Sequence, residues 1–442
     1  MSHSKQKFAR GQQAPKLDAD AGLALTAGHF DQAVEGWAPI GTLPDDVLPE
    51  GQARPKLFDS LVELNHSGGL ALKNRVVVSP MCQYVAKDGF PSVYHLGHHA
   101  SWALHGVGTI MFETTGVTPA GRISTHDLGL WKDEQIPAFI SLVSSLRTLS
   151  PGLTVGVQLG HAGRKSSTFP PFQRRPRKHE QWAEEEEGGW PEEIVAPSAV
   201  PYGPNWFKPR ELSIGEIENI KQQFIQAAER AYDKVGVDFI EIHLAHGYLG
   251  HQFLSPLSNK RTDQYGGSFE GRIKFPLDII KAIRARWPER SLWVRISATD
   301  QCDHLAAQGT EVWDLEQTKK LAEILDREGV AVLDVSSGGL VAEQQIQVGH
   351  AYQAPLAAGI KSLKLPSMKV MSVGMLESGP NDKAGEVAEA TLQNGHADLI
   401  AIARGQMASP NWTELAAANL AGVRTVENPS YHRIHGPKRT PH

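Results

Sequence analysis

The sequence contains few cysteines, which excludes several kinds of protein. Only Cys82 and Cys302 occur in 442 residues. A disulfide-stabilised framework uses more cysteines than this. An iron–sulfur cluster held by four thiolates also needs more than two. Neither kind of protein fits the sequence.

Long apolar runs and an excess of positive charge are also missing. No apolar run reaches the roughly 18 residues that a membrane-spanning helix needs. The basic start, MSHSKQKFAR, leads into no apolar segment, so we expect no secretory signal. Lysine and arginine number 44 against 49 aspartates and glutamates, which leaves a net charge of −5 and no basic field for nucleic acid. We therefore expect a cytoplasmic protein with no nucleic-acid or membrane partner.

A repeated pattern of strand and helix is what the sequence does contain. Apolar stretches such as VVVS, DFIEIH and LWVRIS are typical of strands buried on both faces. Helical periodicity is clear at 213–235, 269–286, 314–327 and 385–394, with Trp287-Pro288 and Asn394-Gly395 as helix ends. Eight strands are predicted, at 75–79, 109–114, 154–159, 238–243, 292–297, 332–336, 369–373 and 398–403.

This alternation predicts an α/β fold, a single (β/α)8 TIM barrel. A dinucleotide-binding open sheet would need a third glycine after Gly106 and Gly108 at the GxGxxG spacing, and none is there. Residues 1–55 are expected to form an irregular N-terminal extension, 56–425 the barrel and 426–442 a C-terminal tail. Within this frame, 57–72 is predicted to be a hairpin plugging the bottom of the barrel. The charged insertion at 170–195, between strands three and four, is predicted to be a solvated loop.

Polar residues follow every predicted strand, and the carboxyl ends of barrel strands form the active-site face. Loops after strands seven and eight of such barrels often bind phosphate, and Gly374 and Arg404 lie there. A cofactor phosphate at that point would lay its ring over the barrel mouth, above Gln158 and Arg295. An amide and a guanidinium there suit the pyrimidine edge of a flavin. For Arg295 the alternative is a buried Asp or Glu partner.

Several segments together resemble the old yellow enzyme family of FMN-dependent ene-reductases. They are SPMCQY (79–84), GVQLGHAGRK (156–165), EIHLAHGYLGHQFLSPLSNKRTDQYGGS (241–268), VRIS (294–297) and the pair Ala403-Arg404. The similarity spans about 57–430, and Cys82 with Tyr84 resembles the thermophilic-like class. It implies a TIM barrel that binds FMN, takes hydride from NADPH or NADH, and reduces electron-poor alkenes. Enones, enals, maleimides and nitroalkenes are the implied substrates, in a ping-pong cycle.

The resemblance also implies roles for individual residues. His243 and His246 would bind the substrate oxygen, Tyr248 would donate the proton, and Tyr84 would contact the substrate. Cys82 would lie beside the flavin and adjust its potential. The implied FMN-binding residues are Ser79, Pro80, Met81, Cys82, Thr114, Gln158, Arg295, Gly374, Ala403 and Arg404. The hydroxyl of Thr114 departs from the small residue common in the family.

Plainer interpretations compete with each of these. The two histidines have a spacing that suits metal ligands, but there is no obvious third ligand and no HExxH, so we expect no metal. Cys82 alone could be a small buried hydrophobe, and Tyr248 a packed aromatic. A flavin-binding isomerase or sensor without reductase turnover is the alternative function. Relatives with an iron–sulfur cluster and extra C-terminal domains do not fit two cysteines and about 40 residues after strand eight.

Assembly is the last expectation. Enzymes of this class place a C-terminal arginine in a neighbour's active site, and Arg433 is the candidate here. The alternative is a surface arginine in a terminal tail. The first interpretation corresponds to a homodimer or higher homo-oligomer.

Overall fold

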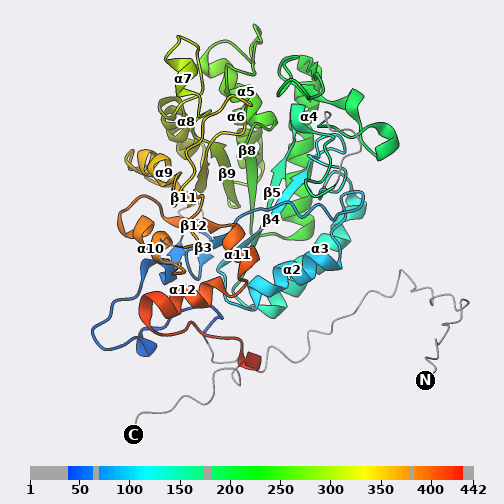
Figure 1. Ribbon diagram of the computed structural model, residues 1–442. Helices are drawn as coiled ribbons and strands as arrows, with labels where there is room; N and C mark the ends of the chain where they lie inside the picture. The colour runs from blue at the N-terminus through cyan, green and yellow to red at the C-terminus, as the bar shows by residue number, and fades with distance from the viewer. Residues whose placement is uncertain (1–37, 63–68, 174–180, 379–382, 432–442) are drawn as a thin grey trace, which may run out of the picture.

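A closed ring of eight parallel strands forms the centre of the computed structural model, which describes residues 38–62, 69–173, 181–378 and 383–431 (Figure 1). Around the ring, each strand pairs with the next one of the ring in sequence, and the last pairs with the first. The strands are β3 (Val76–Val78), β4 (Thr109–Gly116), β5 (Thr154–Gly160), β8 (Phe239–Leu244), β9 (Ser291–Ser297), β10 (Val332–Ser336), β11 (Lys369–Val373) and β12 (Leu399–Ile402).

A helix follows each of these strands and returns the chain to the opposite end of the barrel. These helices are α2 (Val93–Ala103), α3 (Ile136–Leu149), α4 (Ile214–Glu229), α6 (Phe269–Arg286), α8 (Leu315–Arg327), α9 (Ala354–Lys361), α10 (Glu386–Gln393) and α12 (Trp412–Ala421). Shorter helices, α5 (Leu249–Leu254), α7 (Asp303–Ala306) and α11 (Arg404–Ala408), lie in the loops after β8, β9 and β12. The predicted single TIM barrel is confirmed, and all eight predicted strands are present.

Local sequence explains where the helices begin. Ser213 caps α4 by accepting a hydrogen bond from the amide of Glu216, and Asp314 caps α8 in the same way through Gln317. The helix predicted over 213–235 is regular to Glu229 and continues as a π-helical turn, Arg230–Val235. That turn ends at Gly236 with φ of 78°, a conformation that glycine adopts without strain.

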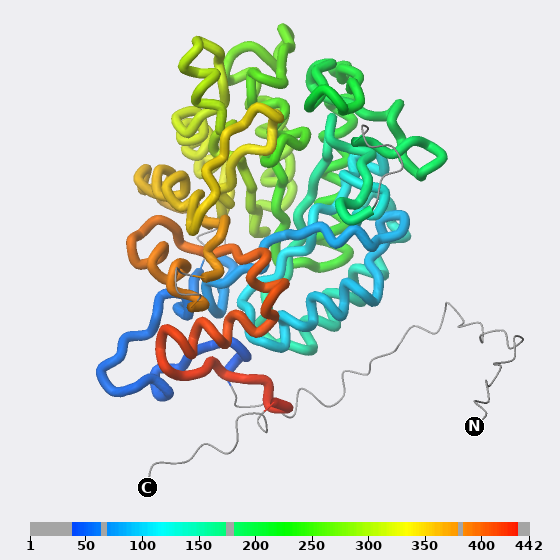
Figure 2. Tube along the Cα trace, in the orientation of Figure 1, coloured from blue at the N-terminus to red at the C-terminus, as the bar shows by residue number. Residues whose placement is uncertain are grey.

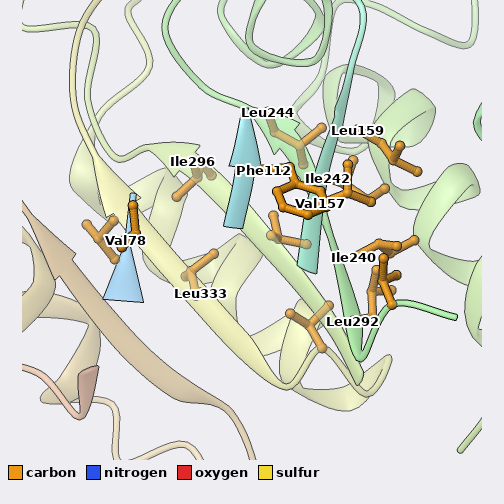
Figure 3. Close-up of a cluster of buried hydrophobic side chains, with 14 of the residues drawn as sticks. Val78, Phe112, Val157, Leu159, Ile240, Ile242, Leu244, Leu292, Ile296 and Leu333 are labelled. Carbon is orange, nitrogen blue, oxygen red and sulfur yellow. The ribbon is translucent and has the colours of Figure 1, made fainter. Parts of the chain in front are cut away.

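The core has two parts, because alternate strand residues point to opposite faces. Outward-facing residues such as Val78, Phe112, Val157, Ile242 and Ile296 form a layer between strands and helices (Figure 3). A smaller cluster includes Met111, Phe239, Trp293, Val332 and Leu399. There the Phe239 and Trp293 rings stack 3.8 Å apart, and a Cβ on Gly156 would come within 2.3 Å of the Phe239 ring. The barrel interior is therefore filled by side chains.

The segments outside the repeat pack against the barrel or against each other. Strands β1 (Leu61–Val62) and β2 (Ala71–Leu72) pair antiparallel, as predicted for a hairpin, and Leu61, Leu70 and Leu72 belong to the smaller core cluster. Closer to the N-terminus, Gly41 and Thr42 form two backbone hydrogen bonds with Val426. The first described residues therefore lie beside the C-terminal segment (Figure 2).

The charged insertion is anchored as well as solvated. Glu185, Glu186 and Glu187 are exposed, but Trp190 is buried and donates its indole N–H to the carbonyl of Ala120 at 2.9 Å. The segment continues into β6 (Val195–Ala196), which pairs with β7 (Arg210–Glu211). Among the described residues, no helix combines the length and apolar character needed to cross a membrane.

Candidate active site

Two histidines and a tyrosine come together at the carboxyl end of β8. His243 lies in the strand itself, and His246 and Tyr248 follow it in a tight loop before α5. The His243 Nε2 and His246 Nδ1 atoms are 3.4 Å apart, and the two rings are nearly perpendicular. The Tyr248 ring centre lies 5.1 Å from that of His243. The structure therefore places the three predicted residues in one group.

The hydrogen bonds around the two histidines indicate which ring nitrogen of each carries the proton. The amide of Ala245 donates to His243 Nδ1, so the ring proton of a neutral His243 is on Nε2. His246 Nε2 lies 2.7 Å from Ser336 Oγ, closer than Gln353 Oε1 at 3.3 Å, which also accepts from the Ser337 hydroxyl at 2.8 Å. The Ser336 hydroxyl can therefore donate to His246 Nε2 and leave the proton on Nδ1. In that tautomer both nitrogens of the 3.4 Å pair carry a proton, so neither accepts from the other and both can donate to a ligand.

An unusual backbone conformation presents this pair. His246 has φ of 58° and Gly247 φ of 72°, so two consecutive residues are left-handed. The amide of His246 donates to Ser297 Oγ on β9, which holds the turn against the barrel. A Cβ on Gly247 would lie 2.0 Å from the carbonyl oxygen of Gly339, so only glycine fits.

All three side chains are uncharged at neutral pH. Burial, with the nearby Arg295 charge as a smaller cause, holds the pKa of His243 and of His246 well below the ordinary value. Burial also raises the pKa of Tyr248 well above its ordinary value. The histidines are therefore neutral donors, and the phenol keeps its proton.

Lys165 lies behind this group. Its ammonium donates to the carbonyls of His246 and Gly339 and lies 5.1 Å from the Tyr248 ring centre and 4.6 Å from that of Tyr202. Burial, with the charge of Arg164 as a smaller cause, lowers the pKa of Lys165 to about 7. Beyond Tyr202 a cavity of about 440 Å³ is lined by Arg164, Trp206, Leu257 and Glu343, among others.

The loop after β3 carries the second group of predicted residues. Ser79 is buried and bonded to Ile402 of β12, while Pro80, Met81 and Cys82 are half-buried. Burial, then the charges of Asp127 and Glu113, raise the pKa of the Cys82 thiol, and hydrogen bonds with Thr114 partly offset them. Cys82 is thus a neutral thiol and not a nucleophilic thiolate. Tyr84 has φ of 57° and an edge-to-face contact with Phe172.

Gln158 and Arg295 lie inside the barrel mouth in a polar layer. Gln158 Nε2 donates to Glu241 at 2.7 Å, and its Oε1 accepts from the Thr114 hydroxyl. Arg295 donates to Ser79 Oγ at 3.3 Å and forms an ion pair with Asp334 at 3.2 Å. The buried acidic partner considered as the alternative for Arg295 is therefore present.

Gly374, Ala403 and Arg404 follow the neighbouring strands β11 and β12. Gly374 has φ of 109°, and a Cβ there would lie 2.7 Å from Gln353 Nε2 and 2.9 Å from the Tyr352 ring. Burial raises the pKa of Tyr352, and the positive charges of Arg295 and Arg404 act in the opposite direction. Both guanidiniums therefore act on one tyrosine beside Gly374.

Some contacts of the site were not predicted from the sequence. Ser297 and Ser336 hold His246, but serines at strand ends are common and carry no signal of their own. Glu241 and Asp334 did carry a signal, because each is a charged residue within an apolar strand, as Arg295 is. His251, which no prediction singled out as functional, is buried between Asp300 and the amide of Gly247. Arg433 lies outside the described residues.

Within residues 38–62, 69–173, 181–378 and 383–431, no group of three or more His, Cys, Asp or Glu is placed to hold a metal ion.

Comparison with known proteins decides the family. Residues 66–422 match the NADH:flavin oxidoreductase / NADH oxidase family. The chain belongs to this family. It is therefore an FMN-dependent oxidoreductase that uses NAD(P)H as reductant, as its resemblance to old yellow enzymes implied.

Relatives and solved structures agree with this membership. An NADH:flavin oxidoreductase of Gibberella zeae is 42% identical over 80% of this chain and 84% of its own. An NADPH dehydrogenase of Geobacillus thermodenitrificans is 40% identical over 83% of this chain and 95% of its own. Morphinone reductase in complex with tetrahydroNAD is 26% identical, with a TM-score of 0.61 over 85% of this chain and 94% of that one. Old Yellow Enzyme from Pichia sp., at 22% identity, shares the fold with a TM-score of 0.65 over 86% and 89% of the two chains.

The polar layer of this flavin oxidoreductase fits an FMN ring. Gln158 has a second amide N–H, and the Arg295 Nη2 has no hydrogen-bond partner among the described residues. Both groups lie in a buried layer where an unused donor would be costly. The exposed Arg404 forms no ion pair within the described part of the chain.

We predict that His243 and His246 stay neutral when the pH falls from 8 to 5.5. Their burial in the folded protein disfavours the imidazolium form, whereas free histidine titrates near pH ~6.5. Nitrogen NMR of protein labelled at histidine, assigned with His243→Asn and His246→Asn, measures this directly. Chemical shifts that move to imidazolium values at pH 6 would contradict the prediction.

Proposed function

We propose that the protein reduces activated C=C bonds of enones, enals, maleimides and nitroalkenes. The observation that carries the proposal is the convergence of His243 Nε2 and His246 Nδ1, 3.4 Å apart, next to the Tyr248 ring. Two N–H donors aimed at one point suit the carbonyl or nitro oxygen of an electron-poor alkene. A phenol beside them suits proton delivery to the carbon next to that activating group.

Each side chain has a defined part in this proposal. When bound, FMN would supply the hydride chemistry of a ping-pong cycle, with NAD(P)H as the reductant. His243 and His246 stabilise the negative charge that develops on the substrate oxygen, and losing one such donor typically costs on the order of 10²–10³ in rate. Tyr248 donates the proton, and Tyr84 contacts the substrate. Neutral histidines suit this hydrogen-bonding role because they stabilise the charged oxygen without transferring a proton to it.

The cofactor residues divide into two groups. Ser79, Pro80, Met81, Cys82, Thr114, Gln158 and Arg295 are proposed to surround the flavin ring. Gly374, Ala403 and Arg404 are proposed to hold its phosphate. The support for this division is the order of β3, β4, β5 and β9 around one part of the mouth and of β11 and β12 around another.

Three further expectations remain proposals. The chain is divided into an extension (1–55), an FMN-binding barrel (56–425) and a tail (426–442). It assembles as a homodimer or higher homo-oligomer in which Arg433 completes a neighbour's site. It acts in the cytoplasm on a small electron-poor alkene.

The proposed cofactor site can be tested through FMN binding. Purified protein should be yellow and release about one FMN per chain on denaturation. Arg404→Gln should weaken FMN binding roughly thirtyfold, because one charge-assisted bond to phosphate contributes about 2 kcal/mol. Fluorescence titration of the apoprotein with FMN measures the Kd.

The matched control for this titration is Arg327→Gln, which removes the same charge from an exposed position on α8. It should leave the Kd as in the wild type. A colourless protein that FMN does not reconstitute would refute the proposed cofactor site. Equal Kd values for the Arg404 and Arg327 variants would remove Arg404 from it.

The proposed role of Tyr248 as proton donor can be tested by substitution. Tyr248→Phe should still be reduced by NADPH at the wild-type rate, because that half of the cycle needs no proton from this residue. Its reoxidation by cyclohexenone should slow by about 10²–10⁴, the usual contribution of a positioned acid. Stopped-flow absorbance separates the two half-reactions.

Tyr202→Phe is the control, because it removes a hydroxyl from the other aromatic ring beside Lys165. It should keep both rates. Tyr248→Phe with an unchanged rate of reoxidation by cyclohexenone would exclude this tyrosine as the proton donor.

A further inference from the structure

Three buried ionisable side chains lie on consecutive strands of the barrel, and this set is called the cluster below. Glu241 of β8 and Asp334 of β10 are 0% exposed, and Arg295 of β9, the strand between them, is 7% exposed. Asp334 Oδ2 lies 3.2 Å from Arg295 Nε. Glu241 forms no ion pair within the described part of the chain, and its hydrogen-bond partner there is the neutral amide of Gln158.

The charges of this cluster do not balance if both acids are ionised. Two carboxylates and one guanidinium would leave a net negative charge in a dry interior, where an uncompensated ion costs several kcal/mol. Glu241 Oε2 and both Asp334 carboxyl oxygens lack a hydrogen-bond partner among the described residues. A single proton bound by one of the two acids removes the excess negative charge.

The contacts indicate which acid holds that proton. Asp334 lies against the only guanidinium of the cluster, which favours its charged form. Glu241 has no cation in contact, and the Asp334 charge disfavours its ionisation. Consistently, burial raises the pKa of Asp334 only to about 6, because Arg295 acts in the opposite direction. Burial and then the Asp334 charge hold the pKa of Glu241 well above its ordinary value, and the smaller effects of the Arg295 charge and the Gln158 hydrogen bond act in the opposite direction.

We propose that Asp334 carries the negative charge of this cluster, while Glu241 stays protonated. By neutralising Arg295, Asp334 limits how strongly the protein favours reduced over oxidised flavin. The inference rests on the proposed placement of Arg295 at the flavin ring. Asp334 acts through Arg295 and is a positioning residue. A bare guanidinium would stabilise the extra negative charge of a reduced flavin more than a paired one does.

The same arrangement gives Glu241 a separate task. Its Oε1 accepts from Gln158 Nε2, and the Thr114 hydroxyl donates to Gln158 Oε1, so the amide plane is held from both ends. A neutral Glu241 can do this without adding charge beneath the ring. Replacing Glu241 by the isosteric, uncharged glutamine should therefore leave the charge of the cluster unchanged.

The test is the midpoint potential of bound FMN in wild type, Asp334→Asn and Glu241→Gln. Asp334→Asn should raise the potential by about 30 mV or more, which is a tenfold shift of a two-electron equilibrium. Glu241→Gln, the matched control, should leave it at the wild-type value. Equal potentials in wild type and Asp334→Asn, or a rise in Glu241→Gln alone or in both variants, would overturn the proposal.

A second measurement keeps the proposal testable if Asp334→Asn does not fold. Infrared difference spectra of wild type minus Glu241→Gln at neutral pH should show a protonated-carboxyl band, and its absence would overturn the assignment of the proton. This spectrum does not need FMN. A wild-type protein that binds no FMN would thus refute the proposed function, whereas a flavin-loaded protein with unchanged potentials refutes this inference alone.

Discussion

A guanidinium cannot lie inside a protein without compensation, and at Arg295 this requirement organises the mouth of the barrel. Arg295 is compensated by Asp334 on the next strand and donates to Ser79 across the mouth. The excess acid, Glu241, holds the amide of Gln158, which in turn binds Thr114. Thr114 is hydrogen-bonded to Cys82. The polar layer therefore links five strands of the barrel and the loop after β3.

The proposed substrate half of the site depends on backbone geometry more than on charge. Two left-handed residues, His246 and Gly247, turn the chain sharply after β8, and serines of β9 and β10 hold His246 in place. The buried Asp300–His251 pair binds the amide of Gly247 and supports the same turn. The donor pair and Tyr248 are thus fixed before any ligand arrives, which is the preorganisation that oxyanion stabilisation requires.

The sequence predicted the fold well because strands covered on both faces must be apolar along their whole length. This signal located all eight strands and, through their ends, the face that carries the site. It also marked Arg295 as an exception within an apolar strand. Glu241 and Asp334 were equally exceptional, but which side chain each one meets depends on the register between β8, β9 and β10, which no local pattern encodes.

Other features could not be predicted for a different reason. Ser297 and Ser336 bind His246 from 51 and 90 residues away, and serine is too common at strand ends to indicate such a contact. Trp190 anchors an insertion whose charge suggested only a solvated loop, because one buried tryptophan among exposed glutamates has no periodicity. The resemblance to old yellow enzymes supplied roles, whereas the structure supplied the hydrogen bonds that orient each side chain.

The central claim is that one site passes hydride from NAD(P)H to an electron-poor alkene through FMN. The most direct measurement is an anaerobic titration of the FMN-loaded protein in one cuvette. Stoichiometric NADPH should bleach the flavin absorbance, and cyclohexenone added afterwards should restore it with formation of one cyclohexanone per flavin. A flavin that NADPH bleaches but that cyclohexenone, maleimide and nitroalkene all fail to reoxidise would contradict the account.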